Sequence, residues 1–153
     1  MNIRRVEPNE ADIALVAPLF DAYRQFYGVA SDPKRAREFL SERLHHRESV
    51  IFVAMNGEPG AEQGIGFVQM YPSFSSVSAR RLWVVNDLFV PPEGRGKGVG
   101  RALMDRARRH ADETGACRLT LETAQDNRAA KSLYRSLGYV LDADVEHYTL
   151  ELK

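Results

Sequence analysis

The sequence predicts an α/β (α+β) domain in which helices flank a mixed, mostly antiparallel sheet. Two observations predict this fold class. Apolar residues alternate or run together in short segments typical of strands, and elsewhere they recur at helical spacing. The strand-like segments of the first half follow one another as hairpins, whereas a helical segment separates those of the second half and predicts a strand–helix–strand crossover. A chain of 153 residues is expected to form a single domain, residues 1–153.

The first half is expected to contain four strands and two helices. "NIRRVE" predicts a short strand, and apolar residues at helical spacing predict a helix from Asn9 to about Tyr27. Asp32 as N-cap and Pro33 at the first helical position predict the second helix. "SVIFVAM" and "GIGFVQMY" predict a hairpin, and "RLWVVNDLFV" predicts a further long strand. Residues 71–78, "YPSFSSVS", are expected to form a polar-aromatic loop between the last two strands.

The second half is expected to alternate between helices and strands. An amphipathic pattern predicts a helix from Gly98 to Thr114, and Gly115 fits its C-terminal stop. "CRLTLET" predicts a strand, and the alternating "HYTLEL" predicts another at the end of the chain. Between them a further helix is predicted by apolar residues that share one face, namely Ala130, Leu133, Tyr134 and Leu137.

Composition argues against several classes of protein. The 21 basic and 21 acidic residues balance, so no global field favours nucleic acid or a membrane. No run approaches the roughly eighteen apolar residues of a membrane span, and the N-terminus lacks the apolar core of a signal peptide. The single cysteine fits a reducing compartment, so a cytoplasmic location is expected. No cluster of histidine and cysteine predicts a metal site.

The stretch "EGRGKGVGRAL" predicts an anion site. Its four glycines fall within seven residues, directly before a helix, and Arg95 and Lys97 add positive charge. The N–H groups at a helix start bind phosphate oxygens, and glycine allows the close approach and positive φ that such contacts need. The spacing does not fit G-x-G-x-x-G, because the third glycine would fall on Val99, Arg101 or Leu103, and it does not fit a P-loop, because Lys97 is followed by Gly98. The alternative is a flexible loop whose glycines only turn the chain.

The spacing does match R-x-x-G-x-G, at Arg95, Gly98 and Gly100, and here the chain resembles the GNAT superfamily of acyl-CoA-dependent N-acetyltransferases. "NDLFVPPEGRGKGVGRALMDRA" is similar to the family's central strand, pyrophosphate loop and helix. "LETAQDNRAAKSLYRSLGY" is similar to its following strand and helix. The resemblance covers about residues 83–152. It implies the GNAT fold, a twisted sheet of about six to seven strands with about four helices, and a bulged central strand that splays from its neighbour.

The resemblance also implies acetyl-CoA as co-substrate, no metal, and a set of residues that hold the coenzyme. The strand backbone would pair with the pantetheine arm, and the N–H groups of the loop would hold the pyrophosphate. Asn127 would hydrogen-bond the pantetheine, with Ala130 packed close by. Tyr134 would donate a proton to the leaving thiolate; its alternative is a core aromatic. The strand residues are Leu88, Phe89 and Val90, and the loop residues are Arg95, Gly96, Lys97, Gly98, Val99, Gly100 and Arg101.

The chemistry of acetyl transfer from a thioester requires a neutral amine but no covalent enzyme intermediate. An amine with a lysine-like pKa of ~10.4 costs about 4–5 kcal/mol to deprotonate at pH 7. A carboxylate or a water chain could take the proton, and Asp87 and Glu122 are the candidate bases. Neighbouring strand residues point to opposite faces, so Asn86 and Asp87 cannot both enter a cleft unless a bulge intervenes. Alternatively, Asp87 satisfies backbone groups at that bulge and Glu122 is a solvated strand end.

The expected acceptor is the primary amine of a small molecule, either a polyamine or an amino-acid-like compound. The aromatic rings of Tyr27, Tyr71 and Phe74 can pack an alkyl stem or a cation. Asn86 and Asp87 are expected to face the same acceptor. Three alternatives stay open: an enzyme acting on a protein amine, a non-catalytic acyl-CoA sensor, and a nucleic-acid-binding protein that would need base-stacking aromatics among its cations. The resemblance is compatible with a homodimer.

Overall fold

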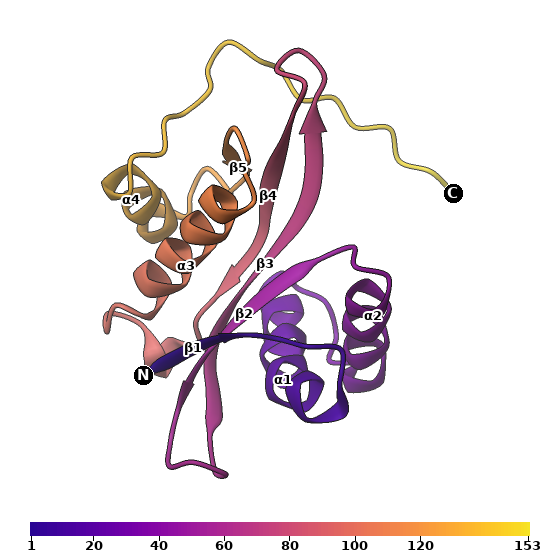
Figure 1. Ribbon diagram of the computed structural model, residues 1–153, viewed down its shortest axis with the longest axis vertical. Coiled ribbons are helices and arrows are strands. Elements are labelled where there is room, and N and C mark those ends of the chain that lie inside the picture. Colours follow the sequence, from indigo (N-terminus) through magenta and orange to yellow (C-terminus); the bar gives the residue numbers. More distant parts are fainter. The chain divides into compact units, whose positions relative to one another are not determined.

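The computed structural model describes residues 1–153, which divide into two units, Met1–Glu122 and Thr123–Lys153 (Figure 1). The second unit contains the helix α4 (Arg128–Ser136). None of the helices combines the length and the hydropathy that a membrane span requires. The first unit contains, in chain order, β1 (Asn2–Arg5), α1 (Glu10–Phe26), α2 (Pro33–His45), β2 (Val50–Asn56), β3 (Gln63–Ser75), β4 (Arg80–Phe89), the short 3-10 helix η1 (Pro92–Gly94), α3 (Val99–Glu113) and β5 (Leu119–Leu121).

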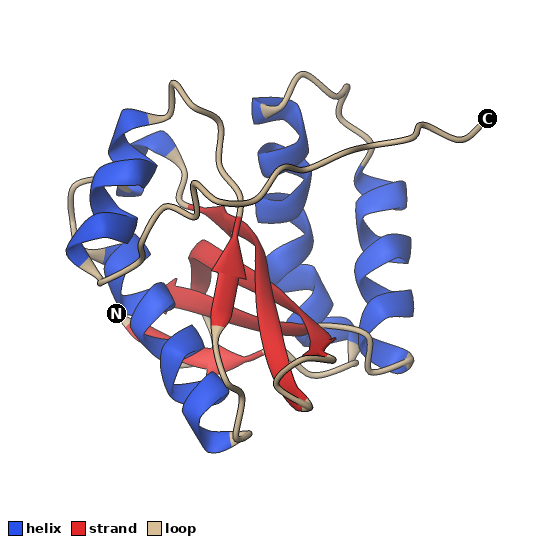
Figure 2. Ribbon diagram, turned by 90° about the horizontal axis from the view of Figure 1, so that it is seen from above, coloured by secondary structure: helices blue, strands red, loops and turns tan.

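The strands of the first unit form one sheet in the order β1-β2-β3-β4-β5. The pairs from β1 to β4 are antiparallel, and β4 and β5 are parallel because α3 connects them as a crossover. Helices α1 and α2 cover one face and α3 covers the other (Figures 1 and 2). On β2, Ile51 and Val53 belong to the core with α1 and α2, whereas Phe52 contacts α3 through Arg106. The predicted mixed sheet flanked by helices is therefore confirmed.

Side chains cap three of the four α-helices. Asn9, Asp32 and Asn127 each accept a hydrogen bond from the backbone N–H three residues later, at 2.9, 3.1 and 3.2 Å. The predicted start of α2 at Asp32 and Pro33 is confirmed. Helix α3 is the exception, because its N-cap is Gly98, which has no side chain. Its first N–H groups are therefore left without a side-chain acceptor.

Strand β4 contains a bulge at Asn86. Asp87 pairs with Gln69 and Val85 pairs with Met70, so Asn86 has no partner on β3. A bulge inserts one residue into one strand and changes the alternation of side chains beyond it. Asn86 and Asp87 can enter one cleft only if a bulge intervenes, and this bulge is present.

The bulge changes which face of the sheet the odd-numbered residues of β4 meet. Before it, the ring of Trp83 packs against His110 of α3, with centroids 4.9 Å apart. After it, Phe89 belongs to the core beneath α1, and its ring lies 6.2 Å from that of Tyr23. In a regular strand, residues 83, 87 and 89 would share one face. The extra residue therefore turns Asp87 away from α3 and towards α1.

The predicted C-terminal strand is absent, and the sheet has five strands instead of the expected six to seven. Residues 147–152, "HYTLEL", belong to no strand and no helix. Tyr148, Leu150 and Leu152, which alternate along this segment, are 84–88% exposed. Alternation predicts a strand only where a partner strand is available, because the ladder of hydrogen bonds defines the element.

The predicted loop at residues 71–78 is also wrong in part. Residues 71–75 continue β3 and pair with β4, and Pro72 lies opposite Trp83. The chain reverses only at residues 76–79, where Ala79 has a φ of 50° and donates to the carbonyl of Ser76 at 3.2 Å. The aromatic residues favour a strand and outweigh the turn signal of Pro72 and the serines.

Candidate active site

Asp87 is a buried carboxylate whose hydrogen-bonding partners are all uncharged. The residue is 3% exposed. Gln69 Nε2 donates to its Oδ2, Asn86 Nδ2 donates to its Oδ1 at 2.9 Å, and the hydroxyl of Tyr23 donates as well. Burial raises the pKa of Asp87, and the three donors oppose that rise. No cation of the protein forms an ion pair with this carboxylate.

Tyrosines of α1 and β3 lie around Asp87. Burial, followed by the charge of Asp87, raises the pKa of Tyr71 to about 12 and also raises the pKa of Tyr23. Both phenols are therefore neutral hydroxyls at physiological pH. Tyr27, the exposed C-cap residue of α1, contacts Tyr23 edge to face with ring centroids 5.0 Å apart. The cluster of Asp87, Tyr23, Tyr71 and Gln69 is called the Asp87 cluster below.

Two members of the Asp87 cluster were absent from the predicted site. Tyr23 carries no signal of its own in the sequence, because it lies within the apolar spacing that predicts the first helix. Gln69 is the single amide within the apolar run "GIGFVQMY", and such an isolated polar residue in a buried strand is a signal that could have indicated it. The register places Gln69 directly opposite Asp87, which no local pattern reveals.

Phe74 lies away from the Asp87 cluster. It is 69% exposed, and the guanidinium of Arg81 stacks 5.1 Å from its ring centroid. Phe74 is five residues along β3 from Gln69, which corresponds to about 16 Å in a strand. The structure thus brings Tyr71 to Asp87 but does not bring Phe74 there.

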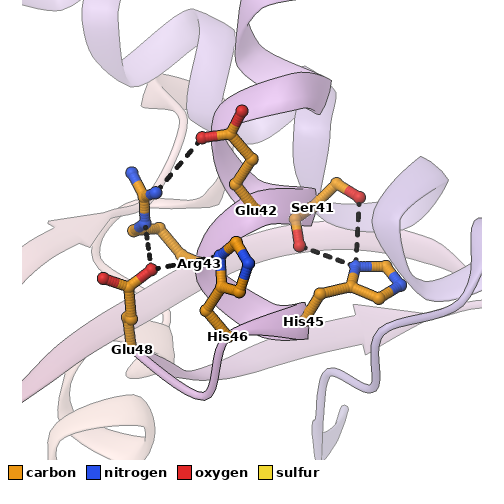
Figure 3. Close-up of polar contacts among 6 residues, drawn as sticks. All are labelled: Ser41, Glu42, Arg43, His45, His46 and Glu48. Carbon is orange, nitrogen blue, oxygen red and sulfur yellow. Dashed lines mark hydrogen bonds and ion pairs between the residues drawn. The ribbon is translucent and has the colours of Figure 1, made fainter.

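Arg43 of α2 is a cation whose charge acts on the Asp87 cluster, since it lowers the pKa of Tyr71 against the effect of burial. Two carboxylates hold its guanidinium: Glu42 accepts from Nη2 at 3.2 Å, and Glu48 accepts from Nε at 3.3 Å (Figure 3). The guanidinium also stacks over the ring of Phe39, 4.9 Å from its centroid. Arg43 therefore belongs to a network of its own and does not neutralise Asp87.

The glycine-rich loop leads into the uncapped start of α3. Gly96 and Gly98 have φ values of 72° and 79°, and a Cβ added at either would meet nothing within 4 Å. No acidic residue stands in the first turn of α3. A helix start that has no side-chain cap, open space beside its glycines and no acidic residue in its first turn can accept an anion.

The two cations of this loop are placed differently. Arg95 Nε donates to the carbonyl of Val90 at 2.9 Å, and the guanidinium stacks 5.6 Å from the ring centroid of Phe26. Arg95 therefore fixes the loop against the end of β4 and against α1. Lys97 is exposed between the two positive-φ glycines. Unlike Arg95, Lys97 makes no side-chain contact that fixes it to the loop.

Strand β4 extends beyond the end of β5. The last pair between them joins Val85 to Leu121, one residue before the bulge. From residue 86 to 89, β4 has β3 on one side and no strand on the other. β4 and β5 are therefore paired only before the bulge, and the open edge at Leu88 and Phe89 can pair with an extended ligand. Val90 follows directly after the strand.

The other predicted residues lie at the end of the first unit or in the second. Glu122 is exposed and follows β5 directly. In the second unit, Asn127 caps α4 by accepting from the N–H of Ala130. Tyr134 is half-buried on the same helix, with its ring centroid 5.9 Å from that of Tyr139. Asn127 and Tyr134 are seven residues apart, about two helical turns, which places them on one side of α4.

The region contains no cluster of metal-ligating side chains. No group of three or more His, Cys, Asp or Glu side chains is arranged to hold a metal ion. Two surface hollows lie against α1 and α2, and none of the predicted site residues lines them. The candidate site is instead defined by the open edge of β4, the start of α3 and the Asp87 cluster.

Comparisons with known proteins agree with this arrangement. Residues 16–139 match the model of the Acetyltransferase (GNAT) family. An uncharacterised N-acetyltransferase of Bacillus subtilis (strain 168), YhfO, is 48% identical over 153 residues, which cover 99% of this chain and 98% of that protein. A crystal structure of a probable acetyltransferase superposes with a TM-score of 0.91 at 40% identity, covering 100% of this chain and 99% of the other.

A more distant relative is the thialysine N-epsilon-acetyltransferase of Bos taurus. It is 27% identical over 110 residues, which cover 72% of this chain and 64% of that protein. The family match spans more than half of the chain and the Bacillus relative covers nearly all of it. The chain therefore belongs to the GNAT family, and it is an acetyltransferase.

Replacing Asp87 by asparagine is expected to stabilise the protein more at neutral pH than at acidic pH. The pKa of Asp87 is raised in the folded state, so its contribution to stability is present below the ordinary value of 3.8 and is lost as pH rises through the folded pKa. Asparagine does not ionise, and Gln69 can turn its amide to bond with it. The difference in free energy of unfolding between Asp87→Asn and wild type should grow with pH and then level off, as urea denaturation at a series of pH values would measure.

Asp21→Asn is the matched control, because its effect has the opposite sign. Hydrogen bonds from Ser31 and from the backbone of Asp32 lower the pKa of Asp21, so its contribution is present at neutral pH and lost as pH falls. Asp21→Asn should therefore destabilise the protein most at neutral pH. A stability difference for Asp87→Asn that does not vary with pH would contradict a raised pKa at Asp87.

Proposed function

We propose that this GNAT acetyltransferase transfers the acetyl group of acetyl-CoA to the primary amine of a small molecule, by direct attack of the amine on the thioester. The observation that carries the proposal is Asp87, a buried carboxylate without a cationic partner, beside the point where β4 leaves β5. One end of the candidate site, at the edge of β4 and the start of α3, can bind an extended phosphorylated donor. The other end, at the Asp87 cluster, has a buried negative charge that a cationic ligand would compensate.

The donor end is formed by the open strand edge and the start of α3. Leu88, Phe89 and Val90 would offer main-chain groups to the pantetheine arm, and the N–H groups of residues 96–101 would bind the pyrophosphate. The open space beside Gly96 and Gly98 fits this assignment, as does the absence of a side-chain cap on α3. An N–H on the open edge of β4 can also polarise the thioester carbonyl and stabilise the oxyanion.

The acceptor end is formed by the Asp87 cluster. A buried carboxylate without a cation is unfavourable, and the ammonium group of an acceptor would compensate its charge. The rings of Tyr23 and Tyr71 add an attraction for cations of roughly 0.5–2 kcal/mol. The ammonium then gives a proton to Asp87, and the raised pKa of Asp87 brings it closer to that of the amine. The distant relative whose name places its acetyl group on an ε-nitrogen supports an alkyl amine as acceptor.

Asp87 is a stronger candidate than Glu122 for the proton acceptor. Glu122 is exposed, so water competes for any ammonium that it binds. Asp87 is buried and hydrogen-bonded in one orientation, so it would hold an ammonium at a defined position. Tyr134 is assigned to the leaving group: a phenol with a pKa near 10 is a mild acid towards a thiolate whose thiol has a pKa of about 8.5.

A screen of amines with acetyl-CoA, in which the release of the thiol is measured, tests the proposed function. The panel contains diamines, polyamines, lysine-like amino acids, aminoglycosides and a lysine-containing peptide, each compared with its alcohol or trimethylammonium analogue. At least one primary alkyl amine should support turnover, whereas its analogues should not. Bound acetyl-CoA without thiol release for any amine would favour the acyl-CoA sensor, and activity with the peptide alone would favour a protein acceptor.

Gly100→Val is expected to weaken binding of coenzyme A by at least about tenfold, equivalent to about 1.4 kcal/mol, because its side chain would obstruct the phosphate at the helix start. Gly100 is the second residue of α3, so valine there needs no positive φ, in contrast to Gly96 and Gly98. Calorimetry of coenzyme A binding measures the change. Asp112→Val introduces the same residue near the other end of α3 and should bind normally. Undiminished affinity in Gly100→Val would contradict the pyrophosphate site.

Tyr134→Phe is expected to lower kcat by roughly ten- to a thousandfold, within or below the usual effect of an acid–base group. The substitution keeps the aromatic packing and removes the hydroxyl, so the Kd for acetyl-CoA should change little. Stopped-flow measurement of thiol release at several pH values gives kcat. Tyr139→Phe is the control, because the ring of Tyr139 is in contact with that of Tyr134. Wild-type turnover at every pH would show that Tyr134 only packs.

A further inference from the structure

Gln69 is an interior amide that uses only half of its hydrogen-bonding groups. It is 0% exposed and lies directly opposite Asp87 in the pairing of β3 with β4. Its Nε2 donates to Asp87 Oδ2, while its Oε1 is buried and has no partner. The ionised carboxylate is an acceptor only, which fixes the nitrogen of the amide towards it.

An unpartnered buried carbonyl is costly, at about 1–3 kcal/mol. Such groups are rare in folded proteins and call for a physical reason. A hydrophobic residue of similar length would fill this position in β3 without that cost. Gln69 is completely buried, so bulk water does not supply its Oε1 with a donor.

We propose that Gln69 is a positioning residue for Asp87, and that its amide follows the protonation state of the carboxyl. While Asp87 is ionised, Gln69 Nε2 donates to Oδ2. When Oδ2 carries a proton, the amide turns over and Gln69 Oε1 accepts from the new O–H group. This role rests on the proposed function of Asp87 as the acceptor of the amine's proton.

The proton balance of the step is simple. An N–H bond of the acceptor's ammonium breaks and an O–H bond forms at Asp87 Oδ2. The electron pair left on nitrogen attacks the thioester carbonyl, the carbon–sulfur bond breaks, and a second N–H proton is transferred to the departing thiolate, so that the products are the neutral amide and the free thiol. After product release, Asp87 returns its proton to water. In both states of Asp87, the rotating amide gives Oδ2 a partner and holds the carboxyl in one orientation.

The two amides that face Asp87 meet different oxygens, because Gln69 Nε2 donates to Oδ2 and Asn86 Nδ2 donates to Oδ1. Tyr23 from α1 and Asn86 from β4 donate to the carboxylate, and the charge of Asp87 acts on Tyr71 of β3. Arg43 of α2 acts on Tyr71 and is held by Glu42 and Glu48. Gln69 is the amide whose nitrogen bonds to Oδ2 and whose oxygen is buried without a partner.

The titration of Asp87 tests the proposal without any acceptor. The protein is labelled with carboxyl-13C aspartate, and the resonance of Asp87 is identified by its loss in Asp87→Asn. In Gln69→Met the anion loses a charge-assisted hydrogen bond, worth more than the neutral bond that the acid loses. The midpoint of the Asp87 titration should therefore rise by about one pH unit.

A second variant keeps the size and polarity of the side chain. Gln69→Glu places another carboxyl against Asp87. Repulsion between like charges at this distance should raise the titration midpoint of the pair further. Gln25→Met is the matched control, because Gln25 also donates to a buried aspartate, Asp21, at 3.2 Å but lies on α1 outside the Asp87 cluster. It should leave the Asp87 midpoint unchanged.

Kinetics add a second reading. With the best amine, the acid limb of the kcat/KM profile of Gln69→Met should shift to higher pH by the same amount as the NMR midpoint. Its kcat should fall by about tenfold, and its Kd for coenzyme A should stay the same. An unchanged Asp87 midpoint in both Gln69 variants, with folded protein that binds coenzyme A, would overturn the proposal. A shifted midpoint with no activity towards any amine would support the role of Gln69 and overturn the proposed function instead.

Discussion

The candidate site depends on one extra residue in β4. Asn86 has no partner on β3, and this bulge turns Asp87 towards α1 while Trp83 remains against α3. Pairing with β5 stops one residue before the bulge, so the same place leaves the edge of β4 open. A single backbone irregularity therefore sets the Asp87 carboxylate, proposed to bind the acceptor, beside the open strand edge that is proposed to bind the donor.

The cost of this arrangement lies in the buried carboxylate. Three neutral donors hold Asp87, but no protein cation compensates its charge, and Gln69 keeps an unpartnered oxygen beside it. Hydrophobic residues in these positions would give a more stable sheet. Retaining the charge is understandable if an ammonium ion supplies the missing cation and then gives up a proton.

Much of the fold could be predicted from the sequence because caps, turns and periodicity are local. The start of α2 at Asp32 and Pro33 and the glycine turn before α3 are examples. The bulge and the register between Gln69 and Asp87 could not be located, since both depend on strand pairing. Two wrong predictions have the same cause. Residues 147–152 alternate but have no partner strand, and Phe74 lies on β3 but far from Asp87.

The pH dependence of acetyl transfer in Asp87→Asn tests the central claim most directly. With the best primary amine, kcat/KM is measured for wild type, Asp87→Asn and Glu122→Gln. If Asp87 accepts the proton, Asp87→Asn should lose rate chiefly near neutral pH and recover as pH approaches the amine pKa of ~10.4, because the amine is then already neutral. Glu122→Gln should keep the shape of the wild-type profile. A wild-type profile in Asp87→Asn would contradict the account.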